Sequence, residues 1–254
     1  MTDRPDQPSA AVEREFLHPG KHRPHYLERV SIVQALRELR HRLKPGRLLD
    51  VGCGMKPYES LLTQRDSRYY GTDWPVTMEG SYGGSTRADF FSDSMVLPFP
   101  EGTFDTIVST QVLEHIRQPE IVIQEMARIL KPNGILILSA PMTWPLHEEP
   151  HDYYRYTLHG LRHLLEEADF NILDEIRRGN NWTTMAQMFL DTQVGNLGRR
   201  LPERVYTALV SLAVHHACSV ASPASSTVQV RCFWAGTLKR RPARRPWASS
   251  RRNF

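Results

Sequence analysis

The chain has 254 residues, of which 40% are hydrophobic and 24% charged, and its formal net charge is +4. This length suits one α/β domain with additions, and no apolar run approaches the roughly 20 residues of a membrane-spanning helix. The three cysteines lack CxxC spacing, which argues against a disulfide framework and a zinc site. The polar amino terminus lacks the apolar core of a secretory signal, so we expect a cytoplasmic protein.

The two ends of the chain are predicted to lie outside the folded domain, which spans 21–240. Residues 1–20 contain several prolines and no hydrophobic periodicity, a pattern typical of a flexible leader. The carboxyl end, 241–254, is rich in arginine and proline and has no acidic residue, so we expect a basic disordered tail. The alternative for this tail is an arm that binds phosphates or anionic lipid headgroups.

Helical and strand patterns alternate in the folded domain. Apolar residues recur at three- and four-residue steps over 25–43, which predicts a helix with one buried face, and a second amphipathic helix is predicted over 121–130. Short apolar runs predict strands at 47–51, 69–71, 85–89, 103–109 and 135–140. Strands that alternate with helices imply a parallel sheet with right-handed crossovers.

The last third of the chain contains an insertion between two strands. A helix is predicted over 158–168 and a strand over 170–176, and the alternating run 228–237 suits an antiparallel last strand. The insert between them, 179–225, has helical patterns. Because its segment 205–220 is apolar nearly all round, we expect it to be buried in a cap, a dimer interface or a membrane surface, or to add a layer of core.

A buried strand runs into a glycine turn at Leu48-Leu-Asp50-Val-Gly52-Cys-Gly54. Gly52 and Gly54 lack a Cβ, so the chain can turn sharply and a ligand can approach the backbone. About twenty residues further on, Asp73 ends the second predicted strand, where a carboxylate can bind a ribose diol. The same spacing occurs in nicotinamide-binding proteins, so the turn alone leaves the cofactor open.

Further motifs narrow the choice of cofactor. They are Gly71-Thr-Asp73, Ala88-Asp89, Leu97-Pro-Phe-Pro-Glu-Gly-Thr-Phe-Asp105, Val112-Leu-Glu-His115 and Arg128-Ile-Leu-Lys-Pro-Asn-Gly134. In this order and spacing, over about residues 45–178, the chain resembles the class I S-adenosylmethionine-dependent methyltransferases of the type 11, ubiquinone-methyltransferase-like family. The resemblance implies an α/β, Rossmann-like three-layer sandwich. Its mostly parallel seven-stranded sheet would have an antiparallel last strand, with the helical insert before it.

The resemblance also implies which residues bind the methyl donor, S-adenosylmethionine. The loop from Asp50 through Gly52 to Gly54 is expected at the methionine end of the donor. Asp73 is expected to take the ribose hydroxyls, and Asp89 to face the adenine amino group, because carboxylate oxygens accept hydrogen bonds from both. The alternative for Asp73 and Asp89 is a role as turn or cap residues.

Two other positions bear on the donor site. Gln111 follows the fourth predicted strand, and open α/β sheets bind ligands beyond the carboxyl ends of their strands, so Gln111 is expected to contact the donor. Lys56 stands where many family members have a third small residue. The loop therefore departs from the family pattern at this point.

Three residues are candidates for proton transfer from the acceptor. His115 can remove a proton from an acceptor hydroxyl because its pKa lies near working pH, and a structural hydrogen bond is the alternative. His151 and Asp152 lie in the segment 141–157, which is dense in titratable and aromatic groups and is expected to cover the acceptor. They form either an acid/base pair or a network that orders the loop.

No metal site is expected in this segment. His147 and His151 are four residues apart, a spacing that binds metal ions when both lie on one helix face. Pro145 and Pro150 oppose a helix here.

These features predict the O-methylation of a small molecule such as a sugar, a glycolipid or a natural product. The run Pro150-His-Asp-Tyr-Tyr-Arg-Tyr-Thr157 resembles a bacterial subset of the family that is often associated with cell-surface glycan and secondary metabolite pathways. The apolar insert and the basic tail suit a lipid-linked acceptor and peripheral membrane contact. The alternatives are an RNA methyltransferase, although no RNA-binding module is recognisable, and a non-catalytic scaffold that binds the donor.

Overall fold

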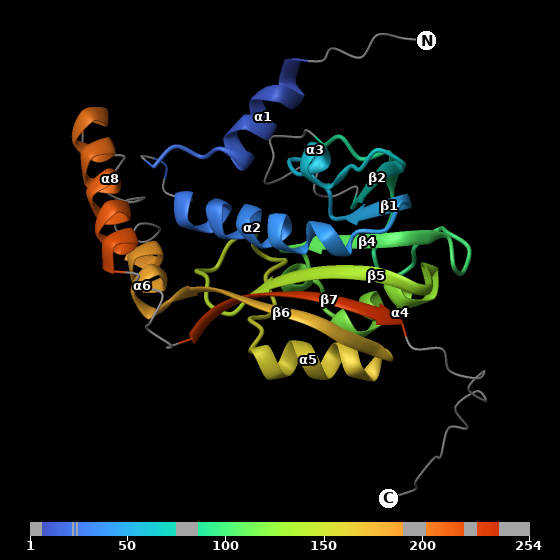
Figure 1. Ribbon diagram of the computed structural model, residues 1–254. Helices are drawn as coiled ribbons and strands as arrows, with labels where there is room; N and C mark the ends of the chain where they lie inside the picture. Colours follow the sequence, from blue (N-terminus) through green and yellow to red (C-terminus); the bar gives the residue numbers. More distant parts are fainter. Residues whose placement is uncertain are drawn as a thin grey trace, which may run out of the picture.

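Helices cover both faces of a central sheet in the computed structural model of the chain (Figure 1). The structure describes residues 7–21, 23, 25–74, 86–189, 202–220 and 228–238. The predicted basic tail, 241–254, lies outside the described residues. The architecture confirms the expected α/β, Rossmann-like fold with a mostly parallel sheet.

The described residues form a sheet of seven strands in the order β3-β2-β1-β4-β5-β7-β6. The strands are β1 Gly46–Val51, β2 Ser67–Asp73, β3 Phe90–Phe91, β4 Phe104–Thr110, β5 Leu130–Pro141, β6 Phe170–Asn180 and β7 Val228–Leu238. Strands β3, β2, β1, β4 and β5 are parallel, whereas β7 is antiparallel to both β5 and β6. The strand order reverses between β1 and β4, and open α/β sheets bind ligands at such a point, beyond the carboxyl ends of the strands.

Helix α2, Tyr26–Leu39, covers one face of the sheet, and helices α4, Pro119–Ile129, and α5, Leu158–Glu167, cover the other (Figure 1). Each helix buries an apolar stripe, as Leu36 of α2 and Met126 of α4 illustrate, since neither side chain is accessible to solvent. Two apolar cores therefore flank the sheet. The remaining short elements on this framework are η1 Arg40–Arg42, α3 Glu59–Leu62 and η3 Leu113–His115.

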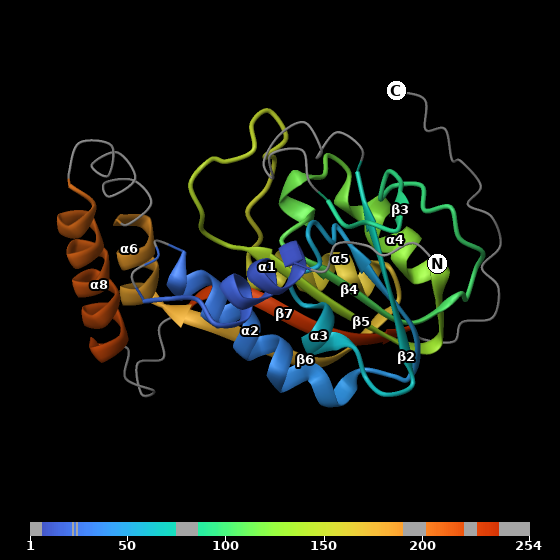
Figure 2. The same cartoon turned by 90° about the horizontal axis from the view of Figure 1, so that it is seen from above.

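The two described helices of the insert, α6 Asn181–Phe189 and α8 Glu203–Val220, lie together beyond the start of α2 (Figure 2). Val210 and Val214 of α8 are buried in a small third core against Tyr26 of α2 and neighbouring side chains. The insert thus adds a side layer to the domain. None of the described helices is long and apolar enough to cross a membrane.

The leader predicted for residues 1–20 contains a helix, α1, Gln7–Leu17, so the expectation of a flexible segment is wrong for these residues. Pro8 lies in the first turn of α1, where a missing backbone N–H costs no helical hydrogen bond. The ring of Phe16 packs against that of Tyr58, with 6.0 Å between centroids. Tertiary contacts of this kind are what a short isolated helix needs to form.

The strand predicted over 85–89 is also wrong, because β3 consists of Phe90 and Phe91. Phe90 pairs with Thr72 of β2, and its ring lies 5.3 Å from that of Phe99, edge to face. Aromatic packing thus decides where this two-residue strand forms. The acidic residue that follows it is Asp93 and not Asp89.

Replacing Leu36 with alanine should lower the free energy of unfolding by about 2–5 kcal/mol, because the change removes buried methyl groups and leaves a cavity between α2 and the sheet. Urea denaturation followed by circular dichroism measures the difference. The matched Gln34→Ala variant, on the exposed side of the same helix, should change it by less than about 0.5 kcal/mol. Equal stabilities of the two variants would contradict the packing of α2.

Candidate active site

The turn after β1 has no room for a side chain at position 52. Gly52, at φ +75°, and Cys53 donate their backbone N–H groups to the carbonyl oxygen of Thr72, at 2.9 and 3.1 Å. A Cβ added to Gly52 would lie 2.3 Å from Cγ2 of Val112. Only glycine fits here, so bare backbone borders the space beyond the ends of β1 and β4.

Asp73 ends β2, as predicted, and its carboxylate is held in place by the backbone. Oδ2 accepts a hydrogen bond from the N–H of Gly54 at 3.0 Å, and Oδ1 accepts one from the N–H of Trp74 at 2.8 Å. Oδ2 also accepts a hydrogen bond from the Thr86 hydroxyl at 3.4 Å. The carboxylate thereby ties the glycine turn to the end of β2.

Two cavities of about 620 Å³ each lie at this edge of the sheet. We call them the Asp73 cavity and the Arg29 cavity. Among the residues that line the Asp73 cavity are Asp73, Trp74, Asp93, Met95, His115 and His151. Among those that line the Arg29 cavity are Phe16, Glu28, Arg29, Asp50, Glu114 and His147. Gly52, Gly54 and Gln111 line both cavities and form the wall that they share.

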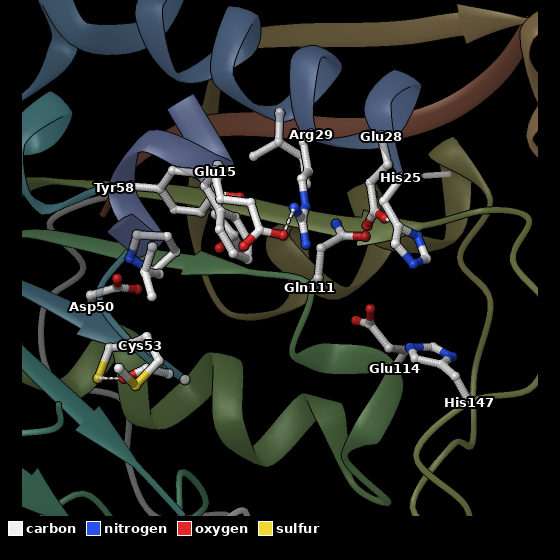
Figure 3. A pocket seen from close by; sticks show the side chains of 18 of the residues that line it. Glu15, His25, Glu28, Arg29, Asp50, Cys53, Tyr58, Gln111, Glu114 and His147 are labelled. Atoms are coloured by element: carbon white, nitrogen blue, oxygen red, sulfur yellow. Dashed lines mark hydrogen bonds and ion pairs between the residues drawn. The ribbon is translucent and has the colours of Figure 1, made fainter. Parts of the chain in front are cut away.

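The Arg29 cavity is lined by both charged and apolar side chains. The Arg29 guanidinium donates a hydrogen bond to Oε1 of Glu15 at 2.6 Å and lies 4.3 Å above the ring of Phe16. Helices α1 and α2 therefore close one side of the cavity together. Figure 3 shows Arg29 and Glu28 pointing into it from α2, with Glu114 and His147 on the opposite side. Sequence analysis placed Arg29 on a helix but did not identify it as a site residue.

Asp50 is buried at the end of β1, and its carboxylate lines the Arg29 cavity. The Tyr69 hydroxyl donates to Oδ2, whereas Oδ1 is buried without a hydrogen-bond partner among the described residues. Burial raises the pKa of Asp50 to about 7, and the charge of Asp73 adds to this rise. The Tyr69 hydrogen bond and the charge of Lys56 act in the opposite direction. A cation that contacts Oδ1 would therefore be stabilised.

Asp89 does not occupy the position that sequence analysis predicted. Its Oδ2 accepts hydrogen bonds from Nζ of Lys56 at 2.5 Å and from the N–H of Gly71 at 2.8 Å. Asp89 lines neither cavity. The ammonium group of Lys56, the residue that departs from the family pattern, holds Asp89 under the glycine loop, whereas the sequence predicted that Asp89 faces the adenine amino group.

Asp93 lines the Asp73 cavity. Its Oδ1 accepts a hydrogen bond from the N–H of Met95 at 2.9 Å, which holds the side chain at the cavity wall. Sequence analysis missed Asp93 because the preceding strand was placed a few residues too early. A strand at Phe90–Phe91 would have identified it.

Gln111 lies between the two cavities in a conformation that few residues other than glycine adopt, with φ 56°. Its backbone N–H donates to the carbonyl oxygen of Ser139 at 3.1 Å, and its side-chain Nε2 donates to the Ser139 hydroxyl at 2.9 Å. Backbone strain of this kind is held in place by surrounding structure and occurs often at functional sites. The position agrees with the predicted contact between Gln111 and a ligand.

His115 and His151 both line the Asp73 cavity. His115 Nδ1 lies 2.7 Å from the carbonyl oxygen of His151, so Nδ1 must carry the hydrogen, and Nε2 lies 3.8 Å from Oε2 of Glu148. Burial lowers the pKa of His115, which favours the neutral ring. His151 contacts the hydroxyl of Tyr153 through Nδ1 at 3.1 Å, and its ring meets that of Trp74 edge to face.

Asp152 is an anchor of the loop and not a partner of His151, which corrects the predicted acid/base pair. Its two oxygens accept hydrogen bonds from the guanidinium of Arg155 at 2.6 and 2.7 Å, and Oδ2 also accepts one from the backbone N–H of His147 at 3.0 Å. Although burial acts in the opposite direction, these contacts lower the pKa of Asp152 to about 2. Such a carboxylate is too weak a base to take a proton at neutral pH.

Residues 21–175, more than half of the chain, match the methyltransferase domain family. The chain belongs to this family. It is 28% identical over 146 residues to a probable S-adenosylmethionine-dependent methyltransferase of Mycolicibacterium smegmatis, an alignment that covers 54% of this chain and 57% of that one. It is 32% identical over 102 residues to the 27-O-demethylrifamycin SV methyltransferase of Amycolatopsis mediterranei, with 37% and 38% covered. The matched part of the chain thus spans 57% of the first of these relatives and 38% of the second.

Two solved structures share the fold. The [4+2]-cyclase SpnF superposes with a TM-score of 0.52 at 23% identity, over 81% of both chains. The phosphoethanolamine N-methyltransferase 2 of Haemonchus contortus, in complex with S-adenosylmethionine, superposes with a TM-score of 0.51 at 16% identity, over 90% of this chain and 60% of that one. At these identities the likeness shows the fold alone.

Replacing Gly52 with alanine should weaken the binding of S-adenosylhomocysteine, the demethylated donor, by roughly tenfold or more, since about 1.4 kcal/mol of strain corresponds to a factor of ten. The new Cβ would displace Val112 and move the turn. Gly102→Ala is the matched control, because Gly102 also has a positive φ, +63°, but its Cβ would meet no atom within 4 Å. Isothermal titration calorimetry compares the variants, and equal affinities would show that the turn does not border the donor.

Proposed function

We propose that the protein, which we group with the type 11 methyltransferases on its motifs, transfers a methyl group from S-adenosylmethionine to a hydroxyl oxygen of a small molecule. The observation that carries this proposal is the wall of Gly52, Gly54 and Gln111 that two cavities share. A donor in one cavity and an acceptor in the other would meet at this wall. Holding two reactants in line supplies much of the rate enhancement of such a transfer.

The residues of the Asp73 cavity fit the adenosine part of the donor. Asp73 and Asp93 both line this cavity, and their carboxylates suit the ribose hydroxyls and the adenine amino group, respectively. Met95 supplies apolar surface for the purine. The methionine part would then follow the glycine turn, where the buried Oδ1 of Asp50 suits an ammonium group.

When bound, S-adenosylmethionine supplies a methyl group on a sulfonium sulfur, and its transfer leaves the electron pair of the carbon–sulfur bond on a neutral thioether while the hydroxyl loses its proton. His151 takes this proton in our proposal, because its ring lines the Asp73 cavity, which shares the wall of Gly52, Gly54 and Gln111 with the Arg29 cavity, and imidazole is the commonest general base. His115 offers a second imidazole, half-buried in the same wall. Asp152 positions the loop that carries His151.

The Arg29 cavity fits an acceptor with both polar and apolar parts. The rings of Phe16 and Trp144 offer apolar surface, and Arg29 and Glu28 offer hydrogen bonds to hydroxyl groups. The name of the Amycolatopsis relative refers to an O-demethylated natural product. This likeness supports an oxygen atom as the methyl acceptor here.

The insert supports an acceptor that carries a hydrocarbon chain. Met185, Phe189 and Leu212 of α6 and α8 are 61%, 55% and 67% exposed. Exposed apolar side chains that gather on one part of a surface mark contact with lipids or other apolar partners. We therefore include lipid-linked acceptors, presented at a membrane surface, in the proposal.

The direct test supplies radiolabelled S-adenosylmethionine and a panel of hydroxylated sugars, glycolipids and polyketides, and measures label in the extracted product. Transfer to oxygen is the expected result. The His151→Ala variant should lower kcat by about 10²- to 10⁴-fold, the usual contribution of a positioned base, with the KM for the donor unchanged. His163→Ala, an exposed histidine on α5, is the matched control and should behave like the wild type.

The other outcomes of this test decide between the alternatives. Transfer of label to RNA instead would favour an RNA methyltransferase. Binding of S-adenosylhomocysteine without transfer to any acceptor would favour a scaffold that binds the donor. Wild-type rates in His151→Ala would remove His151 from the mechanism but leave the transfer itself in place.

Donor binding should release protons through Asp50. An ammonium group at Oδ1 requires the ionised carboxylate, whose pKa is about 7 in the free protein, so affinity should rise from about pH 5.5 to 7. Over this range the donor's own amine, with a pKa of about 7.7–8.0, stays protonated. Titrations in buffers of different ionisation enthalpy measure the protons released. An Asp50→Asn variant should release none, and equal release by both proteins would contradict the contact.

A further inference from the structure

Three side chains with metal-ligating atoms meet at the border between the two cavities. They are Glu114, His115 and His147, and one ligand atom of each lies within 4.8 Å of the others. Glu114 is buried and the two histidines are half-buried, so the group is shielded from solvent but open to the cavities. Figure 3 shows Glu114 and His147 next to one another on the side of the Arg29 cavity that lies opposite Arg29 and Glu28.

The orientation of both imidazoles is already fixed by hydrogen bonds on their far nitrogens. His115 donates from Nδ1 to the carbonyl oxygen of His151 at 2.7 Å. His147 Nδ1 lies 3.2 Å from the carbonyl oxygen of Pro145 and 3.3 Å from Oδ2 of Asp152. Because these oxygens can only accept, Nδ1 carries the hydrogen in both rings and Nε2 has the free lone pair. Metal-binding histidines are oriented in the same way, by a carbonyl or carboxylate behind the ring.

The position of Asp152 is explained by this arrangement. Its carboxylate is anchored by two hydrogen bonds from Arg155, and its side chain is only 1% exposed. It cannot reach a substrate, yet it stands directly behind the ring of His147. The Asp152 carboxylate, anchored by Arg155, therefore holds the ring of His147 toward Glu114 and His115.

We propose that Glu114, His115 and His147 bind one divalent transition-metal ion, such as Zn²⁺, Co²⁺ or Mn²⁺. Two imidazoles and one carboxylate favour these ions over Mg²⁺ and Ca²⁺, which prefer oxygen ligands. Metal–ligand bonds of about 2.0–2.2 Å require the three atoms to move slightly closer together, which rotation of the side chains allows. This proposal revises the expectation from sequence, which considered His147 with His151 and found no metal site.

The ion would lie where the methyl group is transferred, and its use there rests on the proposed function. A hydroxyl group of the acceptor that binds the ion loses its proton more readily, because the positive charge stabilises the alkoxide. The proton would pass to His151 or to water. The oxygen would then form its bond to the methyl carbon as the carbon–sulfur bond of the donor breaks and leaves its electron pair on the thioether sulfur. Vicinal hydroxyl pairs, which can bind one ion through both oxygens, are the acceptor class that this site favours.

Metal binding is tested independently of activity with untagged, metal-free protein titrated with Co²⁺ and followed by visible absorption. One equivalent should bind and produce the d–d bands of a nitrogen- and oxygen-ligated ion. Asp152→Asn should weaken binding by about 10- to 100-fold, the usual effect of losing the partner that orients a ligand. Glu114→Gln and His147→Ala each remove a ligand and should weaken binding further.

His163→Ala is the matched control for a histidine outside the group and should bind Co²⁺ as the wild type does. Circular dichroism verifies that each variant is folded. Absence of a stoichiometric Co²⁺ complex, or equal affinity in the wild type, Glu114→Gln and His147→Ala, would overturn the proposal. Titration with S-adenosylhomocysteine separates the two claims, because the donor site should stay intact in His147→Ala even where the metal is lost.

Discussion

The close approach of Gly52 to Val112 is the constraint on which both cavities depend. A side chain at position 52 would occupy the space beyond β1 and β4, since its Cβ alone would come within 2.3 Å of Val112. The backbone of the turn is instead held by Thr72 and Asp73 of β2, so that its N–H groups and the ends of three strands form one rigid edge. The shared wall of the two cavities, and with it the meeting point of donor and acceptor, follows from this packing.

A second constraint is the anchoring of the loop after β5 to the loop after β4. The backbone N–H groups of Tyr153 and Tyr154 donate to the carbonyl oxygen of Glu114, and the Arg155 guanidinium binds both Asp152 and the carbonyl oxygens of the same loop. Paired and buried charges of this kind hold a loop more firmly than exposed ones. Titratable groups from two loops can therefore face the cavities in fixed orientations, which catalysis by positioning requires.

Sequence patterns predicted the features that depend on a few neighbouring residues. They did not predict the features that depend on tertiary packing. The glycine turn at Gly52 and the acid at Asp73 follow from a buried strand, a tight turn and a strand end, all visible over a few residues. Asp93 was missed because β3 is only two residues long and its place depends on the packing of Phe90 against distant rings. Asp152 is a titratable residue beside a histidine in the sequence, but only the structure shows that Arg155 neutralises it.

The most direct test of the account is the crystal structure of the protein with S-adenosylhomocysteine bound. The account predicts the adenine amino group at Asp93, the ribose hydroxyls at Asp73, and the sulfur at the wall of Gly52 and Gln111, facing the Arg29 cavity. Adenine bound beside Asp89, or a ligand held within the Arg29 cavity alone, would contradict it.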